Sequence, residues 1–539
     1  MTATVRRPRV AIVGGGISGM ACSWKLRNQR CTVDIYESSD KLGGHANSMP
    51  FTGNGRTVDV DTGFVVMEEA TYPQFTSFLL ELGVKTIPTD MSFGVSALNG
   101  ALEWNSLSIM AFVGTLANLF SPWFWRLMFD IVYFNLFARD ILTQQAPVSP
   151  PKKFVGPVEM EIAAIEKDLK VNRRESIADY LKRQKYSEQF IIYFLIPMVA
   201  APWCIDPDEF AANFPARNLI QFILLDTVTK TLRWRTFANG SKTYVDEFQR
   251  QMPHHHKLHL KTVVRSVTRV DGKVLLSFAD GSIETFDHVL LAIHANQAVT
   301  LLGQGASALE RRILGTFTTR RNVCYLHSDK SQLPKHQAAA WNCSLVGDGG
   351  VVRHGQATKN AAKRISITFD MNRLQSIPSP GEKNSPGRVL VSMNPLGMPS
   401  AVQGQIQYSH PLISHESLLM TRHLHRINGV SCIYFAGAWM GYGFHEDGFT
   451  AGAHAARLIT DGHASTPPLD LIQDIQDETA AAYGAGVARL ALRFGVGMVQ
   501  RVLCSGAGLQ QAQQIHCPGG RAGLVDDASH TNKMHGKSY

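Results

Sequence analysis

Three adjacent ionisable side chains, His445, Glu446 and Asp447, stand among glycines and aromatic residues in the stretch AGAWMGYGFHEDGFTAG. Side chains of these types serve as metal ligands, as acid and base catalysts, or as hydrogen-bonding groups that line a cofactor pocket. A metal site is disfavoured, because consecutive residues of a helix or a strand point in different directions and cannot converge on one ion. We therefore favour a cofactor pocket, with His445 and Glu446 as candidates for an additional catalytic role.

A second pattern, at the other end of the chain, predicts which cofactor such a pocket would hold. Residues 9–13 are typical of a buried strand, and Gly14, Gly16 and Gly19 then fill the motif G-x-G-x-x-G before an apolar-periodic helix and a second strand that ends at Glu37. The glycines allow a tight turn, the approach of a pyrophosphate and close packing of helix on strand, while the carboxylate can accept hydrogen bonds from a ribose. The helix N-terminus attracts the phosphates. The pattern predicts a Rossmann-like dinucleotide-binding domain.

The residues that follow Glu37 favour FAD over NAD. The pair Gly43-Gly44 resembles the extended pyrophosphate motif of flavoproteins in the amine oxidase and phytoene desaturase superfamily, and Asp61-Thr62-Gly63 resembles its D-x-G segment. The resemblance implies FAD, and we expect it to be noncovalently bound, because no cysteine lies between residues 439 and 452. Many amine oxidases carry arginine after the glycine pair. This chain has His45, so we expect backbone NH groups to neutralise more of the pyrophosphate charge.

The same resemblance implies a set of cofactor contacts near both ends of the chain. In that superfamily a C-terminal strand, glycine turn and helix place the pyrimidine edge of the flavin at a helix N-terminus, whose dipole stabilises negative charge on the reduced ring. The sequence from residue 433 to residue 459 fits this arrangement. The residues predicted to contact FAD are Gly14, Gly16, Ser18, Gly19, Glu37, Gly43, Gly44, His45, Gly63, Val264, Gly437, Asp447 and Gly448.

A narrower resemblance rests on GGHANS, VDTGFVVMEEATYPQF, FDHVLLAIHANQA and AGAWMGYGFHEDG. These stretches resemble predicted NAD/FAD-binding proteins related to polyenoic fatty acid double-bond isomerase and to flavoproteins associated with cyclopropane or methyl-branched fatty acid synthesis. The resemblance implies a small apolar substrate, fatty acyl or lipid, and hydride transfer at its carbon-carbon double bonds. Isomerisation, oxidation and reduction stay open, the last with NAD(P)H as electron donor.

Two other activities remain as alternatives to reaction at a lipid double bond. The first is a flavin amine oxidase, which is disfavoured because TRRNVCYLHSD contains no lysine before Asp329, where that family usually has one beside the flavin. The second is a desaturase acting on another polyene or isoprenoid. All three are activities of an FAD-dependent oxidoreductase.

We predict an α/β fold with a discontinuous FAD-binding domain of the GR2 type and an α+β substrate domain. A chain of 539 residues exceeds the usual size of one hydrophobic core. The FAD-binding domain is expected over residues 1–71, 241–295 and 426–462, where Asp-Gly pairs at 271–272 and 280–281 predict hairpins. The substrate domain is expected over residues 72–240, which should be mainly helical, and over residues 296–425. Residues 463–539 are expected to form a further helix and a disordered tail.

Composition restricts the partners and the compartment. A formal net charge of +9 would suit nucleic acid, an anionic cofactor or an acidic membrane surface. The 53 lysines and arginines are scattered in singles and pairs, so we expect no nucleic-acid partner. The eight cysteines form no CxxC motif, which favours a reducing, cytoplasmic compartment. Glycines in the apolar N-terminal run argue against a signal peptide. No pattern predicts an oligomeric state.

The uncharged run from Trp104 to Trp125 bears on contact with a membrane. Its 22 residues are long enough to span a bilayer, but asparagines, serines and Pro122 make it a poor span. Arg126, Asp130 and later charges then alternate with large apolar residues, which predicts an amphipathic helix. A buried pair of helices is the favoured interpretation, and peripheral contact with a membrane interface is the alternative.

Overall fold

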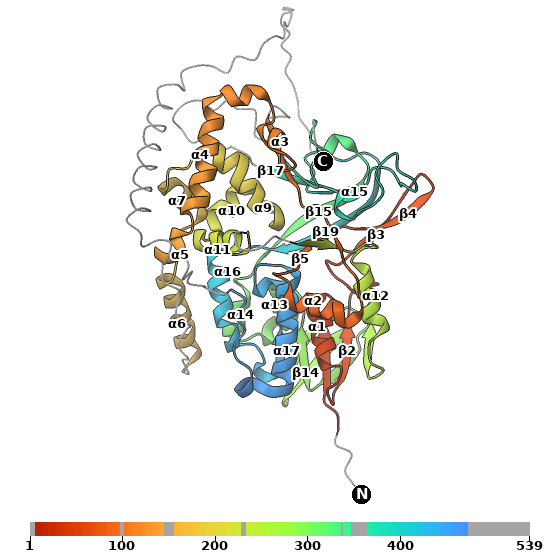
Figure 1. The fold of residues 1–539 in the computed structure, drawn as a ribbon. Coiled ribbons are helices and arrows are strands. Elements are labelled where there is room, and N and C mark those ends of the chain that lie inside the picture. Colours follow the sequence, from red (N-terminus) through yellow and green to blue (C-terminus); the bar gives the residue numbers. More distant parts are fainter. Residues whose placement is uncertain are drawn as a thin grey trace, which may run out of the picture.

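A five-stranded parallel sheet forms the lower half of the protein (Figure 1). The computed structural model describes residues 6–97, 102–144, 156–227, 233–335, 338–346 and 364–472. Apolar residues fill β1 on both faces, as a strand covered on both sides requires. In spatial order the strands are β10 (His256–His259), β2 (Thr32–Tyr36), β1 (Arg9–Val13), β14 (His288–Leu291) and β20 (Ile433–Phe435). Three distant stretches of the chain therefore build one sheet.

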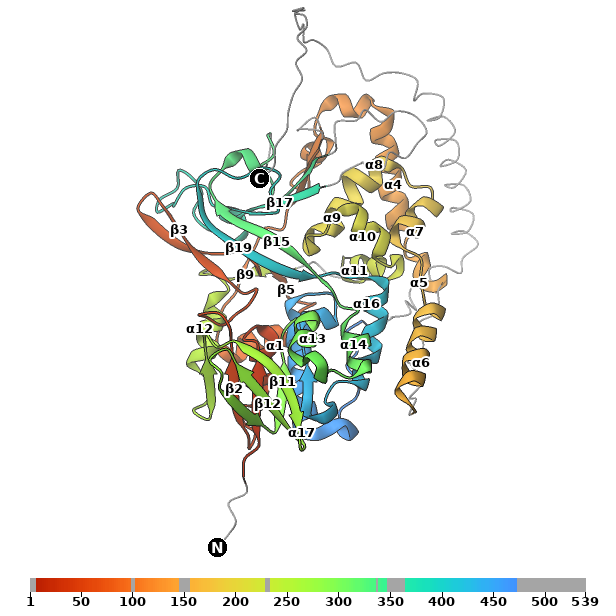
Figure 2. The ribbon, with the colours of Figure 1, turned by 180° about the vertical axis from the view of Figure 1, so that it is seen from behind.

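Helices cover one side of this sheet and an antiparallel sheet covers the other. The helices α1 (Ile17–Leu26) and α17 (His445–Ser465) pack together on the side that faces the viewer in Figure 1. The antiparallel sheet, in front in Figure 2, consists of β11 (Val264–Val270), β12 (Lys273–Phe278) and β13 (Ile283–Phe286). Val267, Leu276 and Phe286 join the same hydrophobic core as β1. The Asp-Gly pairs do form the turns between these strands, as the sequence predicts.

A seven-stranded mixed sheet crosses the upper half of the protein. Only its β16–β7 pair is parallel among the pairings of the described strands. The strand order is β19 (Val402–Pro411), β15 (Thr319–His327), β18 (Leu390–Met393), β17 (Arg364–Asp370), β16 (Trp341–Val346), β7 (Phe93–Ala97) and β8 (Leu102–Asn105). Smaller sheets are β3 (Ser48–Gly53) with β4 (Arg56–Asp61), and β5 (Met67–Glu68) with β9 (Trp234–Thr236) and β6 (Ile87–Pro88).

A helical region lies beside the large sheet and has an apolar core of its own (Figures 1 and 2). It contains α4 (Pro122–Phe137), α5 (Asp140–Gln144), α6 (Val158–Val171), α7 (Ile177–Arg183), α8 (Glu188–Phe190), the π-helical turn η3 (Ile191–Leu195), α9 (Ile196–Ala200), η4 (Ala201–Trp203), α10 (Pro207–Asn213) and α11 (Ala216–Thr227). The other long helices are α2 (Pro73–Leu82), α12 (Lys242–Arg250), α13 (Ala295–Leu302) and α14 (Ala308–Leu314). The short elements are α3 (Ile109–Val113), η2 (Leu116–Phe120), α15 (Met371–Leu374), α16 (His415–Met420), η5 (Gly303–Gly305), η6 (Lys330–Gln332), η7 (Thr421–Arg426), η8 (Val430–Cys432) and η9 (Ala438–Met440).

The run from Trp104 to Trp125 is divided among four elements. It starts in β8, passes through α3 and η2 and ends in the first turn of α4. None of the helices in the described ranges is long and apolar enough to cross a membrane. The helix predicted near residues 486–503 and the predicted tail lie outside the described residues, and the domain boundaries stay a prediction.

Candidate cofactor site

The predicted cofactor residues gather at the carboxyl edge of the parallel sheet. The chain leaves β1 for α1, leaves β14 for α13 and leaves β20 for α17 at this edge. Strand β1 has β2 on one side and β14 on the other, so the direction of strand order reverses between β1 and β14. Open sheets with this topology bind their ligands in the crevice at that reversal.

The glycine loop after β1 has the form that a pyrophosphate requires. A Cβ atom on Gly19 would lie 2.0 Å from the carbonyl oxygen of Gly14, so only glycine allows α1 to pack this closely. A Cβ atom on Gly16 would meet nothing within 4 Å. Gly16 is also the N-cap of α1 and no side chain caps that helix. The open space beside Gly16 therefore lies at a helix N-terminus, where a phosphate is stabilised.

Glu37 and the pair Gly43-Gly44 lie against this loop. The Oε2 atom of Glu37 accepts a hydrogen bond from the backbone N–H of Gly15 at 2.7 Å. The N–H of Gly43 donates to the carbonyl oxygen of Gly15 at 2.9 Å, and Gly44 has a φ of +58°. The N–H of Thr262, two residues before Val264, donates to the carbonyl of Glu37 at 2.9 Å. These contacts bring Glu37, the Gly43-Gly44 pair and the segment just before Val264 close to the loop after β1.

His45 lies in a cluster of aromatic rings between the two large sheets. Its ring stacks on Tyr408 with centroids 5.0 Å apart, and His410 and His294 lie at 5.2 and 6.3 Å. Burial and then the neighbouring histidines lower the pKa of His45 well below its usual value, so the ring is neutral. Its buried Nε2 atom has no hydrogen-bond partner among the described residues. A buried polar atom without a partner is costly, so a cofactor atom that reached Nε2 would fit the site.

Gly63, Ser18, Gly437 and Gly448 lie in close-packed turns and helix starts near the carboxyl edge of the sheet. A Cβ atom on Gly63 would lie 2.3 Å from the carbonyl oxygen of His45, and one on Gly448 would lie 3.2 Å from the Oγ atom of Ser18. The loop that begins at Gly437 is tied to the loop after β14, because the indole N–H of Trp439 donates to the carbonyl of Ile293 at 3.0 Å. The open space beside Gly16 and the unpartnered Nε2 atom of His45 thus fit a dinucleotide, and the contacts of the other predicted residues with FAD stay a prediction.

The side chain of His445 packs into the protein interior. Its ring stacks on Phe64 with centroids 3.6 Å apart, and its Nε2 atom lies 3.0 Å from the hydroxyl of Tyr244. Burial lowers the pKa of His445 to about 3, so the imidazole is neutral at every ordinary pH. These contacts support a role in positioning the start of α17, and a catalytic role for His445 stays a prediction.

Glu446 and Asp447 each bind backbone N–H groups. Both carboxylate oxygens of Glu446 accept hydrogen bonds at the start of α2, from the N–H of Gln74 at 3.0 Å and from that of Phe75 at 2.8 Å. The Oδ2 atom of Asp447 accepts from the N–H groups of Tyr442 and Phe444 at 3.0 and 2.9 Å. Burial raises the pKa of both carboxyls, that of Asp447 to about 7. The three adjacent side chains therefore face three different targets.

We expect Glu446→Ala to destabilise the protein by about 1–3 kcal/mol, because two N–H groups at the start of α2 lose their acceptor. Thermal unfolding measures this loss. Glu446→Gln keeps one acceptor oxygen and is the matched variant for chemistry. If Glu446→Gln keeps its melting temperature and its flavin but loses turnover, Glu446 acts as an acid or a base. Full turnover in that variant would make Glu446 a helix cap alone.

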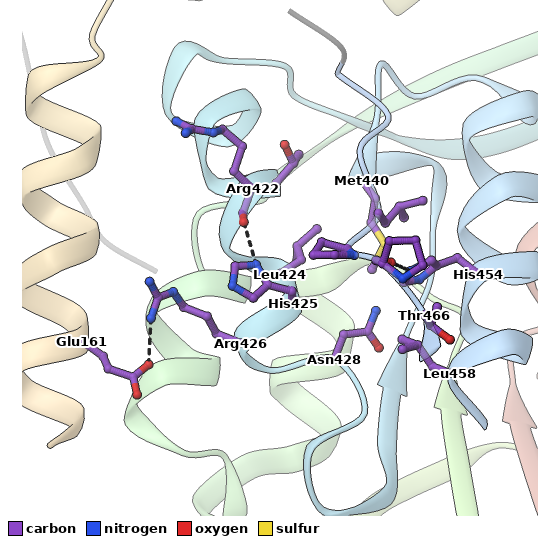
Figure 3. A pocket seen from close by; sticks show the side chains of 14 residues that line it. Glu161, Arg422, Leu424, His425, Arg426, Asn428, Met440, His454, Leu458 and Thr466 are labelled. Carbon is purple, nitrogen blue, oxygen red and sulfur yellow. Dashed lines mark hydrogen bonds and ion pairs between the residues drawn. The ribbon is translucent and has the colours of Figure 1, made fainter. Parts of the chain in front are cut away.

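A separate cavity of about 320 Å³ lies between η7 and α17 and is shown in Figure 3. Arg426 lines it and pairs with Glu161 at 3.1 Å, and the Nε2 atom of His454 bonds to the carbonyl of Pro467 at 2.8 Å. Met440, in the loop that precedes α17, forms part of the same wall. None of the predicted cofactor residues lines this cavity, so we assign it no part in cofactor binding.

Sequence reasoning missed His294 and His410. His294 lies in the short loop after β14 and is the N-cap of α13, so its place just past a core strand was a usable signal. His410 comes from β19 in the other large sheet and its Nδ1 atom lies 2.6 Å from Asn322 Nδ2. Nothing in the local sequence around His410 indicates that it meets His45.

Parts of this chain are similar in sequence to known proteins. Residues 12–82 match the family model of an NAD(P)-binding Rossmann-like domain. A 2,6-dihydroxypyridine 3-monooxygenase of Paenarthrobacter nicotinovorans is 32% identical over 124 residues, which are 21% of this chain and 26% of that protein. Protoporphyrinogen oxidase 2 of Arabidopsis thaliana is 23% identical over 240 residues, 44% of this chain and 41% of that protein. The chain thus matches less than half the length of either relative.

Solved structures resemble the chain over most of its length. The CLA-producing fatty acid isomerase from P. acnes superposes with a TM-score of 0.56 at 14% identity, over 85% of this chain and 99% of that one. Cyclohexylamine oxidase from Brevibacterium oxydans superposes with a TM-score of 0.57 at 14% identity, with the same coverage. Together with the glycine loop and the discontinuous parallel sheet, these likenesses show that the chain has the same fold as these two enzymes, with a Rossmann-like NAD(P)-binding domain at its N-terminus.

Proposed function

We propose that the protein is an FAD-dependent oxidoreductase that acts by hydride transfer at carbon-carbon double bonds of a long apolar substrate, a fatty acyl chain or a lipid. The observation that carries the proposal is the apolar wall beside the loop before α17. Phe444 of that loop stacks on Phe222 with centroids 5.6 Å apart, and Trp203 packs against Phe444 at the same distance. The indole N–H of Trp203 donates to the carbonyl of Tyr442 at 2.6 Å. This wall continues into the apolar core of the helical region.

The residues of the chain would bind and orient the cofactor. The N-terminus of α1 would hold the pyrophosphate, Glu37 the ribose, and the N-terminus of α17 the pyrimidine edge of the flavin. The neutral ring of His45 bonds to the backbone of Ser409, so its free Nε2 atom would accept a hydrogen bond from a hydroxyl or N–H group of the cofactor. When bound, FAD supplies a hydride acceptor that can take hydride from an allylic carbon of the substrate and either return it to another substrate carbon or transfer it to an external acceptor. The apolar wall would exclude water from the reacting carbon.

Binding of an amine would need an acceptor for its ammonium group. The buried carboxylates near the site are already occupied. Asp61 accepts from the hydroxyl of Ser48 at 2.6 Å and the N–H of Ser241 at 2.8 Å, and Glu446 and Asp447 bind backbone N–H groups. This favours a substrate without an ammonium group over an amine. The likeness to cyclohexylamine oxidase keeps amine oxidation as the second candidate, and a polyene desaturase is a variant of the first.

Anaerobic mixing of the flavin-loaded protein with candidate substrates tests the proposal. With unsaturated fatty acids or phospholipids we expect a double bond to migrate, or the flavin to bleach as the chain is oxidised. With NADH or NADPH present, saturation of the alkene would identify a nicotinamide as the electron donor. Flavin absorbance and analysis of the lipid products distinguish these reactions. Bleaching by amines alone, with peroxide formed when oxygen is readmitted, would refute the lipid proposal.

A further inference from the structure

Large apolar side chains are exposed together at one end of the protein. We define the apolar tip as residues 109–125, which comprise α3, η2 and the first turn of α4. Both views place it at the end farthest from the parallel sheet (Figures 1 and 2). The exposed fractions of its side chains are 84% for Ile109, 60% for Met110, 63% for Leu116, 88% for Phe120 and 58% for Trp125. The tip contains no charged residue.

Helix α4 continues this surface, because its outer face carries no charged side chain. Its two charged residues face inward: Asp130 is fully buried, and the side chain of Arg126, 13% exposed, bonds to it at 3.0 Å. Asp130 also accepts a hydrogen bond from the N–H of Ser187 at 2.9 Å. Trp125 and Val132, one heptad apart, face outward and are more than half exposed. A helix at a water interface carries its charges on the outer face, where α4 instead exposes apolar residues.

Polar side chains of the tip and of α4 bond to the backbone of these same elements. The indole N–H of Trp125 donates to the carbonyl of Leu119 at 2.8 Å, and the amide of Asn118 donates to that of Val113 at 2.7 Å. Farther along α4, the amide of Asn135 donates to the carbonyl of Ile131 at 2.8 Å. These contacts bond the indole of Trp125 and the amides of Asn118 and Asn135 within the protein.

We propose that the apolar tip docks on a lipid bilayer and inserts its side chains below the headgroups. A protein partner would exchange about one hydrogen bond for each 100–200 Å² of interface. Hydrocarbon exchanges none, so it suits a surface whose polar groups are satisfied internally. Tryptophan and phenylalanine favour the boundary between headgroups and hydrocarbon. The inference rests on the exposed residues alone and would hold for any substrate of the proposed enzyme.

Flotation of the full chain with phosphatidylcholine vesicles tests this docking. We expect the protein to float with the vesicles, and the double variant Ile109→Asp with Phe120→Asp to partition at least about tenfold less. The matched control is Ile283→Asp with Met398→Asp, whose side chains are 63% and 69% exposed on other elements. The control should float like the parent protein. All three proteins should show the same thermal unfolding, since every substituted side chain is exposed.

Five results would overturn the proposal. The parent protein could stay in solution, the tip variant could float as well as the parent, or the control could lose binding equally. Alternatively, binding could require anionic lipid and vanish at high salt, which would assign it to the positive net charge and not to the uncharged tip. Gel filtration without vesicles addresses a second copy as the partner. A dimer that the tip variant converts to a monomer would also overturn lipid docking.

Discussion

Replacement of Gly16 by valine should give a folded protein that no longer retains FAD. The valine side chain would not clash with the folded protein, because a Cβ atom at this position meets nothing within 4 Å. The backbone there is extended, with a φ of −77°. The side chain would, however, occupy the space at the N-terminus of α1 where the pyrophosphate is expected. We expect the affinity for FAD to fall more than about a hundredfold, which corresponds to about 3 kcal/mol. Flavin absorbance after gel filtration and thermal unfolding measure the two effects separately.

Gly19→Val is the control that separates cofactor binding from folding. A Cβ atom on Gly19 would lie 2.0 Å from the carbonyl oxygen of Gly14, so this variant should lose stability whether or not FAD is present. If Gly16→Val unfolds like Gly19→Val, the space beside Gly16 is needed for folding. If Gly16→Val instead keeps its flavin at full occupancy, the pyrophosphate does not pass this position, and the proposed binding of FAD along the sheet edge is wrong.

The dinucleotide-binding part of the fold was predictable because its signals are local. The turn at Gly14, the close approach at Gly19 and the carboxylate of Glu37 all lie within one strand-helix-strand unit. Each residue type has a steric or electrostatic reason at its position. The hairpin at Asp271 and Gly272 is equally local, since both residues adopt positive φ there. Local geometry of this kind leaves a direct trace in the sequence.

The seven-stranded sheet could not be predicted from local sequence signals. Strand β7 lies in a stretch predicted to be mainly helical, yet it pairs in parallel with β16, with Phe93 opposite Trp341. The partner lies far along the chain, and pairing over such a distance depends on tertiary packing that no local pattern encodes. The same limit applies to His410, which β19 brings to His45 from another sheet.

The orientations of His445, Glu446 and Asp447 could not be predicted from the sequence either. The sequence showed that three ionisable groups adjoin the start of a helix, but not where each one points. In the structure Glu446 binds the start of α2 and His445 stacks on Phe64, and both contacts cross between elements distant in sequence. Residue type alone made a catalytic role plausible for His445. Its contacts instead favour a role in holding α17 against α2 and Tyr244.

Asp447 should control both the stability of the protein and its retention of flavin. Asp447→Ala removes the acceptor for the N–H groups of Tyr442 and Phe444 and leaves both without it, at an expected cost of about 3 kcal/mol. The loop before α17 would loosen, and with it the helix end expected to hold the pyrimidine edge, so this variant should also lose FAD. Asp447→Asn keeps an acceptor oxygen without the charge and should stay folded.

The pH dependence of stability distinguishes the charge of Asp447 from its hydrogen bonds. Burial raises the pKa of this carboxyl to about 7 in the folded protein, whereas an unfolded aspartate titrates near 3.9. The folded state therefore holds this proton more tightly. Its contribution to stability is fully present below about pH 4 and is lost as the pH rises to about 7. Because Asp61 behaves alike, with a pKa raised to about 7, the parent must be compared with the variant and not judged alone. The stability of the parent relative to Asp447→Asn should fall over this range by at most about 1.4 kcal/mol per pH unit. Chemical unfolding at several pH values measures this difference, and a constant difference from pH 4 to pH 7 would mean that Asp447 is ionised throughout.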